Sequence, residues 1–244
     1  SIAVLPFENK GAKEDDFYAY GISSDLISDV TSTGMIRVAG LNDIEKLDYS
    51  SMSYKDLSDK LLVRYVAKGT LWKMDTMFQL SMELFDTKNS ELVWSNRWQT
   101  AWRDLATIKD DLSNNILENL NIIITKNVEQ VNMASNPEAY EYYLKGQYKF
   151  EKRVTLEDLM VARGFYQKAV ELDSTLITAM IKLAKTFQYT NEFDTYMELS
   201  RKALNKAKKI GDKTNQAYAY MGIGTAYYFR DGDIDKAQEY YLKG

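Results

Sequence analysis

The chain has 244 residues, of which 45% are hydrophobic and 27% charged, so it can bury a sizeable core in one large domain or two ordinary ones. Lys and Arg number 31 against 35 Asp and Glu, and the formal net charge of −4 predicts no strong attraction to nucleic acid or to an anionic membrane. Cys and His are absent, which excludes cysteine nucleophiles, Cys/His zinc sites and Ser-His-Asp triads.

The first part of the chain begins with mixed strand and helix signals. Residues 2–7 are a short apolar run typical of a buried strand. Residues 16–31 carry apolar side chains at helical spacing, and residues 35–39 and 54–62 indicate a second short strand and a short helix. Strands and helices therefore alternate from the start.

Three closely spaced strands follow, at residues 64–73, 77–86 and 92–98. In the second of them, apolar and polar residues alternate with a period of two, which predicts a sheet with one buried face. Asp104 begins a helix with an apolar stripe. The order β-α-β-α-β-β-β-α predicts an α/β domain on a mixed sheet. The alternating apolar residues are Phe78, Leu80, Met82 and Leu84.

The rest of the chain is predicted to be helical. Residues 122–136 are expected to form a connector, after which Asn136 can cap a helix and Pro137 suits its first position. No strand pattern follows. The sequence thus predicts an α/β mixed-sheet domain at residues 1–121, followed by an all-α helical-repeat domain at residues 137–244.

The helical part contains a repeated pattern. In "ARGFYQKAVELDS", Ala162 and Tyr166 have the A-x3-F spacing of the tetratricopeptide signature, and Ser174 stands where Pro is usual. "LAKTF" and "GIGTAYYFRDGDIDKAQEYYLKG" give further partial matches. This part therefore resembles about three tetratricopeptide repeats, the last of them truncated.

The first part also resembles a known family. "SIAVLPFEN", "FYAYGISSDLISDV", "IRVAG", "RYVAKGTLWK", "LSMELFDTKNSELVWSNRW" and "DLATIKDDLSNNIL" occur in the order found in the TolB amino-terminal-like domain. That domain often precedes tetratricopeptide repeats in bacterial signalling proteins that carry an upstream membrane helix and an output domain such as a cyclase. The resemblance implies a periplasmic, membrane-anchored location, with a cytoplasmic one as the alternative. It brings no catalytic motif.

Three local motifs contain residue types that can carry chemistry. "GISSD", at residues 21–25, lacks the G-x-S-x-G spacing and is interpreted as the amino end of a helix. The acidic residues 14–16 are interpreted as a solvated loop. "DGDIDKAQEYYL" begins like a calcium loop, but Lys236 and Leu242 stand where Gly and Glu are required. The sequence predicts no catalytic residue, no metal and no cofactor.

The tryptophans cluster along the predicted sheet. Trp94 and Trp98 are an even number of residues apart and so share one face of a strand. Packing against a helix is expected of them, and stacking on a ligand is the alternative. The four tryptophans of the chain are Trp72, Trp94, Trp98 and Trp102.

The tyrosines of the helical part are the main functional signal. Stacked helical repeats form a superhelix whose concave face is lined by the first helix of each repeat. Tyrosine offers a large amphipathic contact area at low entropy cost, and lysine can pair with a carboxylate. That several of these side chains instead fill space between helices stays open. The predicted partner-binding groove comprises Tyr140, Tyr143, Gln147, Lys182, Lys185, Tyr189, Tyr218 and Tyr228.

These observations predict a non-enzymatic signalling or sensor module that binds a protein or peptide through its repeats. Two alternatives are an oligomerisation scaffold for upstream output domains and an enzyme that uses carboxylates or lysine with a divalent metal. For this fragment we expect neither nucleic-acid binding nor membrane contact. Assembly into a homo-oligomer stays open.

Overall fold

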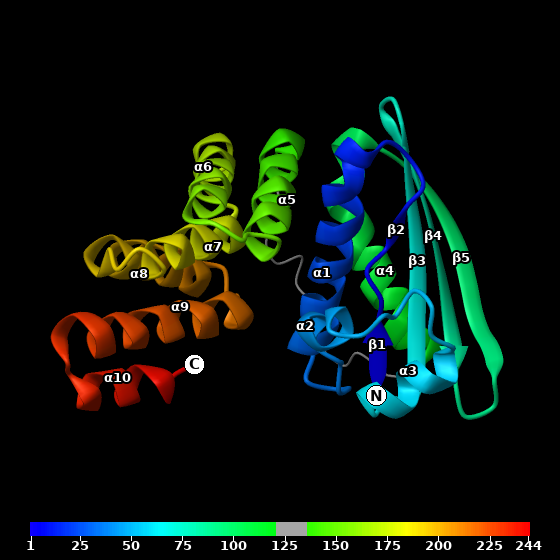
Figure 1. Cartoon of the computed structure of the whole chain (residues 1–244). Coiled ribbons are helices and arrows are strands. Elements are labelled where there is room, and N and C mark those ends of the chain that lie inside the picture. Colours follow the sequence, from blue (N-terminus) through cyan, green and yellow to red (C-terminus); the bar gives the residue numbers. More distant parts are fainter. Residues whose placement is uncertain (121–135) are drawn as a thin grey trace. The chain divides into compact units, whose positions relative to one another are not determined.

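A computed structural model describes residues 1–120 and 136–244, and the chain divides into two compact units, Ser1–Asn127 and Val128–Gly244 (Figure 1). The first unit is α/β on a mixed sheet and the second is entirely helical, which confirms the predicted fold class. The predicted connector at residues 122–136 lies outside the described residues except for Asn136. Among the described residues, no helix combines the length and apolar character needed to cross a membrane.

The first unit contains a five-stranded sheet in the order β1-β3-β4-β5, with β2 also paired to β3. β1 and β2 run parallel to β3, whereas β3, β4 and β5 form an antiparallel meander. The strand expected at residues 35–39 is reduced to a single parallel bridge between Val38 and Ile2. The elements are β1 (Ile2–Val4), β2 (Glu8–Asn9), η1 (Lys13–Asp15), α1 (Asp16–Ser32), α2 (Leu41–Glu45), α3 (Tyr54–Leu61), β3 (Tyr65–Met74), β4 (Met77–Asp86), β5 (Glu91–Ala101), η2 (Trp102–Asp104) and α4 (Leu105–Asn119).

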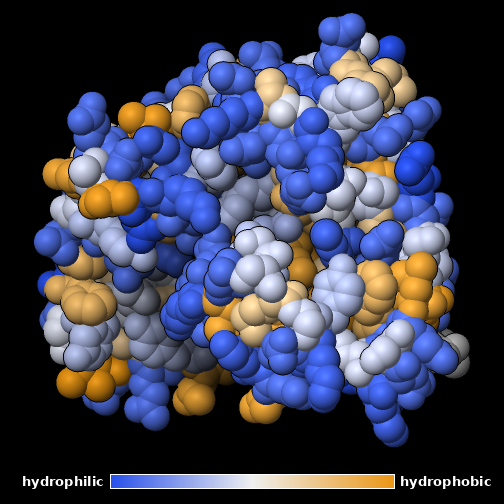
Figure 2. All heavy atoms as spheres, turned by 45° about the vertical axis from the view of Figure 1, so that its right-hand side comes forward, coloured by the Kyte–Doolittle hydropathy of each residue, from blue (hydrophilic) through white to orange (hydrophobic). Residues whose placement is uncertain are grey.

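Helices α1 and α4 cover one face of this sheet (Figure 1). The alternating residues of β4 point to that face, where Phe78 and Leu80 are fully buried, as their period of two predicts. The ring of Tyr18 on α1 meets that of Phe78 edge-on at 4.8 Å between centroids. β5 forms one edge of the sheet, on the side that comes forward in Figure 2, where apolar side chains stand among polar ones.

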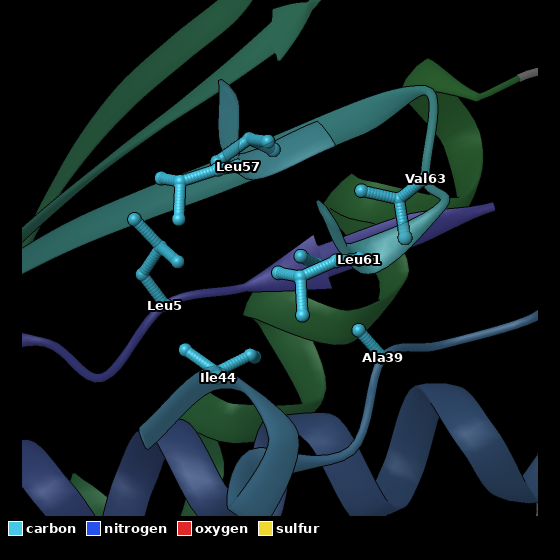
Figure 3. Close-up of a cluster of buried hydrophobic side chains, with 8 residues drawn as sticks. Leu5, Ala39, Ile44, Leu57, Leu61 and Val63 are labelled. Atoms are coloured by element: carbon cyan, nitrogen blue, oxygen red, sulfur yellow. The ribbon is translucent and has the colours of Figure 1, made fainter. Parts of the chain in front are cut away.

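A second cluster of buried side chains lies beside β1 and the first residues of β3 (Figure 3). Leu57 and Leu61 of α3 pack there with Ile44 of α2 and Leu5. Ser53 starts α3 by accepting a hydrogen bond from the amide of Asp56, which satisfies one of the free donors of the first turn. The short helices thus extend the core beyond the sheet.

The "GISSD" segment lies within α1 and not at its amino end, which corrects the sequence interpretation. α1 already begins at Asp16, so residues 21–25 occupy its second and third turns. Ser23 is fully buried, and its hydroxyl donates to the carbonyls of Ala19 and Tyr20. Its proton is therefore held by the helix backbone, as is common for serine inside a helix.

A buried carboxylate ties β4 to the start of β3. Asp86 accepts hydrogen bonds from Arg64, with 2.7 Å between Nη2 and Oδ2, and from the amide of Lys88 at 3.0 Å. Only 6% of the Asp86 side chain is exposed, against 48% for Arg64. The Arg64 guanidinium holds the pKa of Asp86 below its ordinary value.

We expect Asp86→Asn to lower the free energy of unfolding at neutral pH by about 1 kcal/mol, because the Arg64 guanidinium then donates to a neutral amide oxygen instead of a carboxylate, while the half-exposed Arg64 stays solvated. Since the pKa of Asp86 is lowered in the folded chain, this stabilisation is present at neutral pH and is lost as the pH falls below the ordinary aspartate pKa of about 4. Urea unfolding of both proteins at neutral and acidic pH measures it. The difference should shrink in acid, and a constant difference would contradict this role for Asp86.

The second unit is a succession of helices in which each packs against the next. Asn136 caps the first helix by accepting from the amides of Glu138 and Ala139, as predicted. Thr155 and Asp158 form a capping box at the start of the second helix. The elements are α5 (Pro137–Glu151), α6 (Leu156–Leu172), α7 (Ile177–Gln188), α8 (Phe193–Lys209), α9 (Lys213–Ala226), the π-helical segment η3 (Tyr227–Asp231) and α10 (Ile234–Tyr241).

Small and aromatic residues meet where these helices cross. Tyr166 of α6 is fully buried, and a Cβ built on Gly146 of α5 would lie 2.7 Å from its ring. Ala162 and Ala169, at the repeat positions found in the sequence, are also fully buried. Close crossing of α5 and α6 therefore depends on small residues beside an aromatic ring.

Candidate functional site

The predicted groove residues on α7 form one accessible stripe. Lys182, Lys185 and Tyr189 are separated by three and four residues, which places them on one side of the helix. Lys182 is partly exposed, Lys185 is exposed, and Tyr189 keeps 49% of its surface. The opposite side of α7 buries Met180 and Ala184 in the core. The stripe is therefore what the amphipathic helix leaves to solvent.

A second stripe continues from α9 into η3. Tyr218, Met221 and Tyr228 are 49%, 51% and 50% exposed. The other side of α9 crosses α8 closely, because a Cβ on Gly222 would lie 2.5 Å from the hydroxyl of Ser200. Packing on that side leaves Tyr218 and Met221 of α9 on the accessible side.

The two stripes begin next to each other, because α7 and α9 are in contact. Nδ2 of Asn215 lies 3.4 Å from Oγ1 of Thr178. Asn215 stands three residues before Tyr218, and Thr178 stands four residues before Lys182, so each is one helical turn from its stripe. A row of cationic side chains on α7 thus starts beside a row of aromatic and Met side chains on α9.

The ring of Tyr189 is held in place although it is half exposed. It meets Phe150 of α5 edge-on at 5.5 Å between centroids. The guanidinium carbon of Arg153 lies 4.5 Å from the Tyr189 ring centroid and 3.9 Å from that of Phe150. Lys185 adds a second cation, with Nζ 5.8 Å from the Phe150 ring. A ring fixed between a cation and another ring loses little entropy when it binds a partner.

Arg153 and Met221 were missed by the sequence analysis. Met221 lies three residues after Tyr218, so helical spacing from that tyrosine could have found it. Arg153 lies after the end of α5, and its side chain also donates to the carbonyl of Phe150. Nothing in the sequence indicates that a turn residue folds back onto Tyr189, because that contact depends on how α5 packs with α7.

The other three predicted groove residues lie inside the helical unit. Tyr140, Tyr143 and Gln147 of α5 are 3%, 2% and 3% exposed. The rings of Tyr140 and Tyr143 stack at 5.8 Å between centroids, and Tyr143 lies 6.2 Å from Tyr166 of α6. The accessible part of the predicted groove is therefore the part carried by α7, α9 and η3.

The acidic segments are occupied by local contacts. Asp15 pairs with Lys73 at 2.9 Å, and Asp233 accepts from the amide of Lys236 at the start of α10. In the described ranges, no group of three acidic, His or Cys side chains is placed to hold a metal ion. Burial raises the pKa of Tyr196, on α8, to about 12, so this phenol stays neutral at physiological pH.

No family model matches the chain. A curated protein of Rhizobium meliloti, named "Putative adenylate cyclase 3", is 24% identical over 188 residues, which are 75% of this chain and 32% of that protein. The chain therefore spans about a third of this relative.

Several solved structures resemble parts of the chain. They include lipoprotein GNA1162 from Neisseria meningitidis, with 15% identity, a TM-score of 0.37, and 48% of this chain and 97% of that chain covered. TolB from Acinetobacter baumannii is 14% identical with a TM-score of 0.38, covering 49% of this chain and 27% of that chain. The MamA protein is 22% identical with a TM-score of 0.36, covering 58% and 68%.

Proposed function

We propose that this chain is a non-enzymatic interaction module that binds an extended peptide segment of a partner protein along α7 and α9. The observation that carries the proposal is the cationic row of Lys182 and Lys185 beside the half-exposed row of Tyr218 and Met221. Tyr189 stands at the end of the cationic row with its ring held by Arg153. A peptide with carboxylates on one side and apolar side chains on the other fits this pattern.

The two rows would contribute differently to binding. Aromatic and Met side chains supply most of the contact energy in such interfaces, because they bury a large area with few rotatable bonds. The lysines remain near solvent, so they would act mainly on the association rate and on the choice of partner. Affinity should therefore fall with salt but persist at high ionic strength.

We further propose that the module serves a longer regulator. The motif order of residues 1–121 and 137–244 resembles a TolB amino-terminal-like domain followed by tetratricopeptide repeats, and the relative named as an adenylate cyclase extends well beyond the matched region. In such a protein this chain would be the interaction part and not the catalytic part. A periplasmic location with an upstream membrane anchor accords with the resemblance, and a cytoplasmic location is the alternative.

The test uses peptides selected on the wild-type chain from a random displayed library, with their affinities then measured by fluorescence polarisation. Reversing both α7 charges, Lys182→Glu with Lys185→Glu, should weaken binding by about tenfold or more, because repulsion replaces attraction. The matched control reverses two exposed lysines on α6 and α8, Lys168→Glu with Lys209→Glu, and should leave affinity unchanged. Equal affinities for all three proteins, or selected peptides without acidic residues, would refute the proposal.

A further inference from the structure

β5 is a long strand at the edge of the sheet. It has 11 residues, Glu91–Ala101, and within the described chain it pairs only with β4. The other edge is made of β1 and β2, which have three and two residues. β1 is covered by its neighbours: Ile2 donates to the carbonyl of Arg37, and Ala39 donates to the carbonyl of Ile2. Among the described residues, the sheet therefore has one long edge to which no further strand is paired.

The hydrogen-bond pattern shows which backbone groups of β5 point outward. The amide of Trp102 donates to the carbonyl of Thr76 at 2.7 Å. In an antiparallel pair the backbone groups of alternate residues face the same neighbour, so those of Thr100, Trp98 and Asn96 also face β4. In the register between β4 and β5, Trp98 lies opposite Leu80 and Asn96 lies opposite Met82. The backbone groups of Ser95, Arg97 and Gln99 then point away from the sheet. The amide of Arg97 accordingly donates to the side chain of its neighbour Asn96, at 2.8 Å to Oδ1.

This edge has few of the features by which proteins prevent pairing between edges. The strand contains no Pro, Gly or Lys, and Arg97 is the only charged residue beyond Glu91. Its one irregularity, a register shift opposite Leu84 and Phe85, lies near the amino end of β5. The segment from Trp94 to Ala101 is regular, so it can accept another strand.

We propose that β5 pairs in antiparallel fashion with β5 of a second copy of this chain, about a twofold axis at Asn96. Asn96 is the midpoint of Glu91–Ala101, so this register pairs residues 94–98 of both copies within the regular segment and brings residues 99–101 opposite residues 91–93. Ser95 of one copy then exchanges backbone hydrogen bonds with Arg97 of the other. Trp94 of each copy faces Trp98 of the other, on the face of the sheet that these two residues already share.

Charge and aromatic packing favour this register over its neighbour. A twofold axis at Arg97 would place two guanidinium groups directly opposite each other, which is destabilising. With the axis at Asn96, each Arg97 faces a serine and each Glu91 faces an alanine. The rings of Trp94 and Trp98, 5.6 Å apart in one chain and partly exposed, would extend into a cluster of four across the axis.

A second copy fits the edge better than a strand of an unrelated protein, because this pattern is complementary to itself. Pairing about a twofold axis uses the long edge of both copies and leaves the short edges made of β1 and β2. The assembly therefore closes as a dimer and does not grow into a fibre. This inference is independent of the peptide site proposed on α7 and α9.

Disulfide trapping tests the register, since the chain has no cysteine of its own. In Asn96→Cys, the two Cα atoms at the axis would lie about 4.5 Å apart as a non-hydrogen-bonded pair, within the range that a disulfide can bridge. Oxidation of the full chain should give a covalent dimer on a denaturing gel. In the control Ser95→Cys, the equivalent atoms lie beyond disulfide reach, and the yield should be low.

Light scattering over a concentration series tests the dimer itself. Wild type should reach the mass of two chains, and so should Arg97→Ala, which keeps its amide. Arg97→Pro removes an outward amide but no bond to β4, so it should fold and stay monomeric. Monomeric wild type at every concentration, or equal trapping of the two cysteine variants, would overturn the proposal. If Arg97→Pro fails to fold, the trapping result decides.

Discussion

Replacing Tyr166 with alanine is expected to lower the free energy of unfolding of the helical unit by about 3–5 kcal/mol. Its side chain is fully buried, with the rings of Tyr143 and Phe150 at 6.2 Å and 6.3 Å between centroids. Truncation removes the apolar contact and leaves a cavity that α5 and α6 cannot close without moving. Tyr166→Phe keeps the ring and should cost much less.

The chain offers two spectroscopic signals for this measurement. All four tryptophans, Trp72, Trp94, Trp98 and Trp102, lie in the α/β unit, so their fluorescence follows that unit alone. Far-ultraviolet circular dichroism is dominated by helices, most of which lie in the second unit. Tyr166→Ala should shift the urea midpoint of the dichroism transition and leave that of the fluorescence transition in place.

Phe78→Ala is the counterpart in the first unit. Phe78 is fully buried against Tyr18 of α1, so its truncation should shift the fluorescence transition instead, by a similar free energy of about 3–5 kcal/mol. If each substitution shifted both transitions equally, the two units would unfold as one cooperative body, and the proposed division into two domains would be wrong.

Periodicity and capping residues predicted those parts of the fold in which a residue pattern is compatible with only one local structure. The alternation from Phe78 to Leu84 indicates a strand with one buried face, and that face is buried. Asn136 before Pro137 indicates a helix start, and Asn136 caps α5. "GISSD" was misplaced because serine near glycine suits a helix end, whereas Ser23 satisfies its hydroxyl inside α1.

The candidate site could be predicted only in part, because tyrosine suits both a core and a surface. Tyr143 and Tyr218 occupy first helices of the predicted repeats, yet one is 2% exposed and the other 49%. What separates them is the neighbouring helix: the glycine at 146 brings α6 and its Tyr166 close to α5. The spacing of residues in the sequence does not show how closely two helices cross. The sequence also does not predict that β5 lies at an edge, because this position follows from the order of the strands in the sheet.

Two glycine-to-alanine substitutions in the helical unit should change the free energy of unfolding in opposite directions. A Cβ on Gly164 of α6 meets nothing within 4 Å, so Gly164→Ala should stabilise by about 0.5–1 kcal/mol through helix propensity alone. A Cβ on Gly146 would lie 2.7 Å and 2.8 Å from two carbons of the buried Tyr166 ring. The ring has no free space to move into, so overpacking should cost about 1–3 kcal/mol there.

Because both positions gain the same propensity, the difference between the two variants isolates the helix crossing. We expect the two variants to differ by the overpacking cost, about 1–3 kcal/mol, in urea unfolding followed by circular dichroism. Combining Gly146→Ala with Tyr166→Ala should recover part of the loss, since the two residues are in contact and their effects are not additive. If both glycine variants were stabilised alike, α5 and α6 would not cross as closely as Tyr166 and Gly146 indicate, and the resemblance to tetratricopeptide packing would lose its main physical basis.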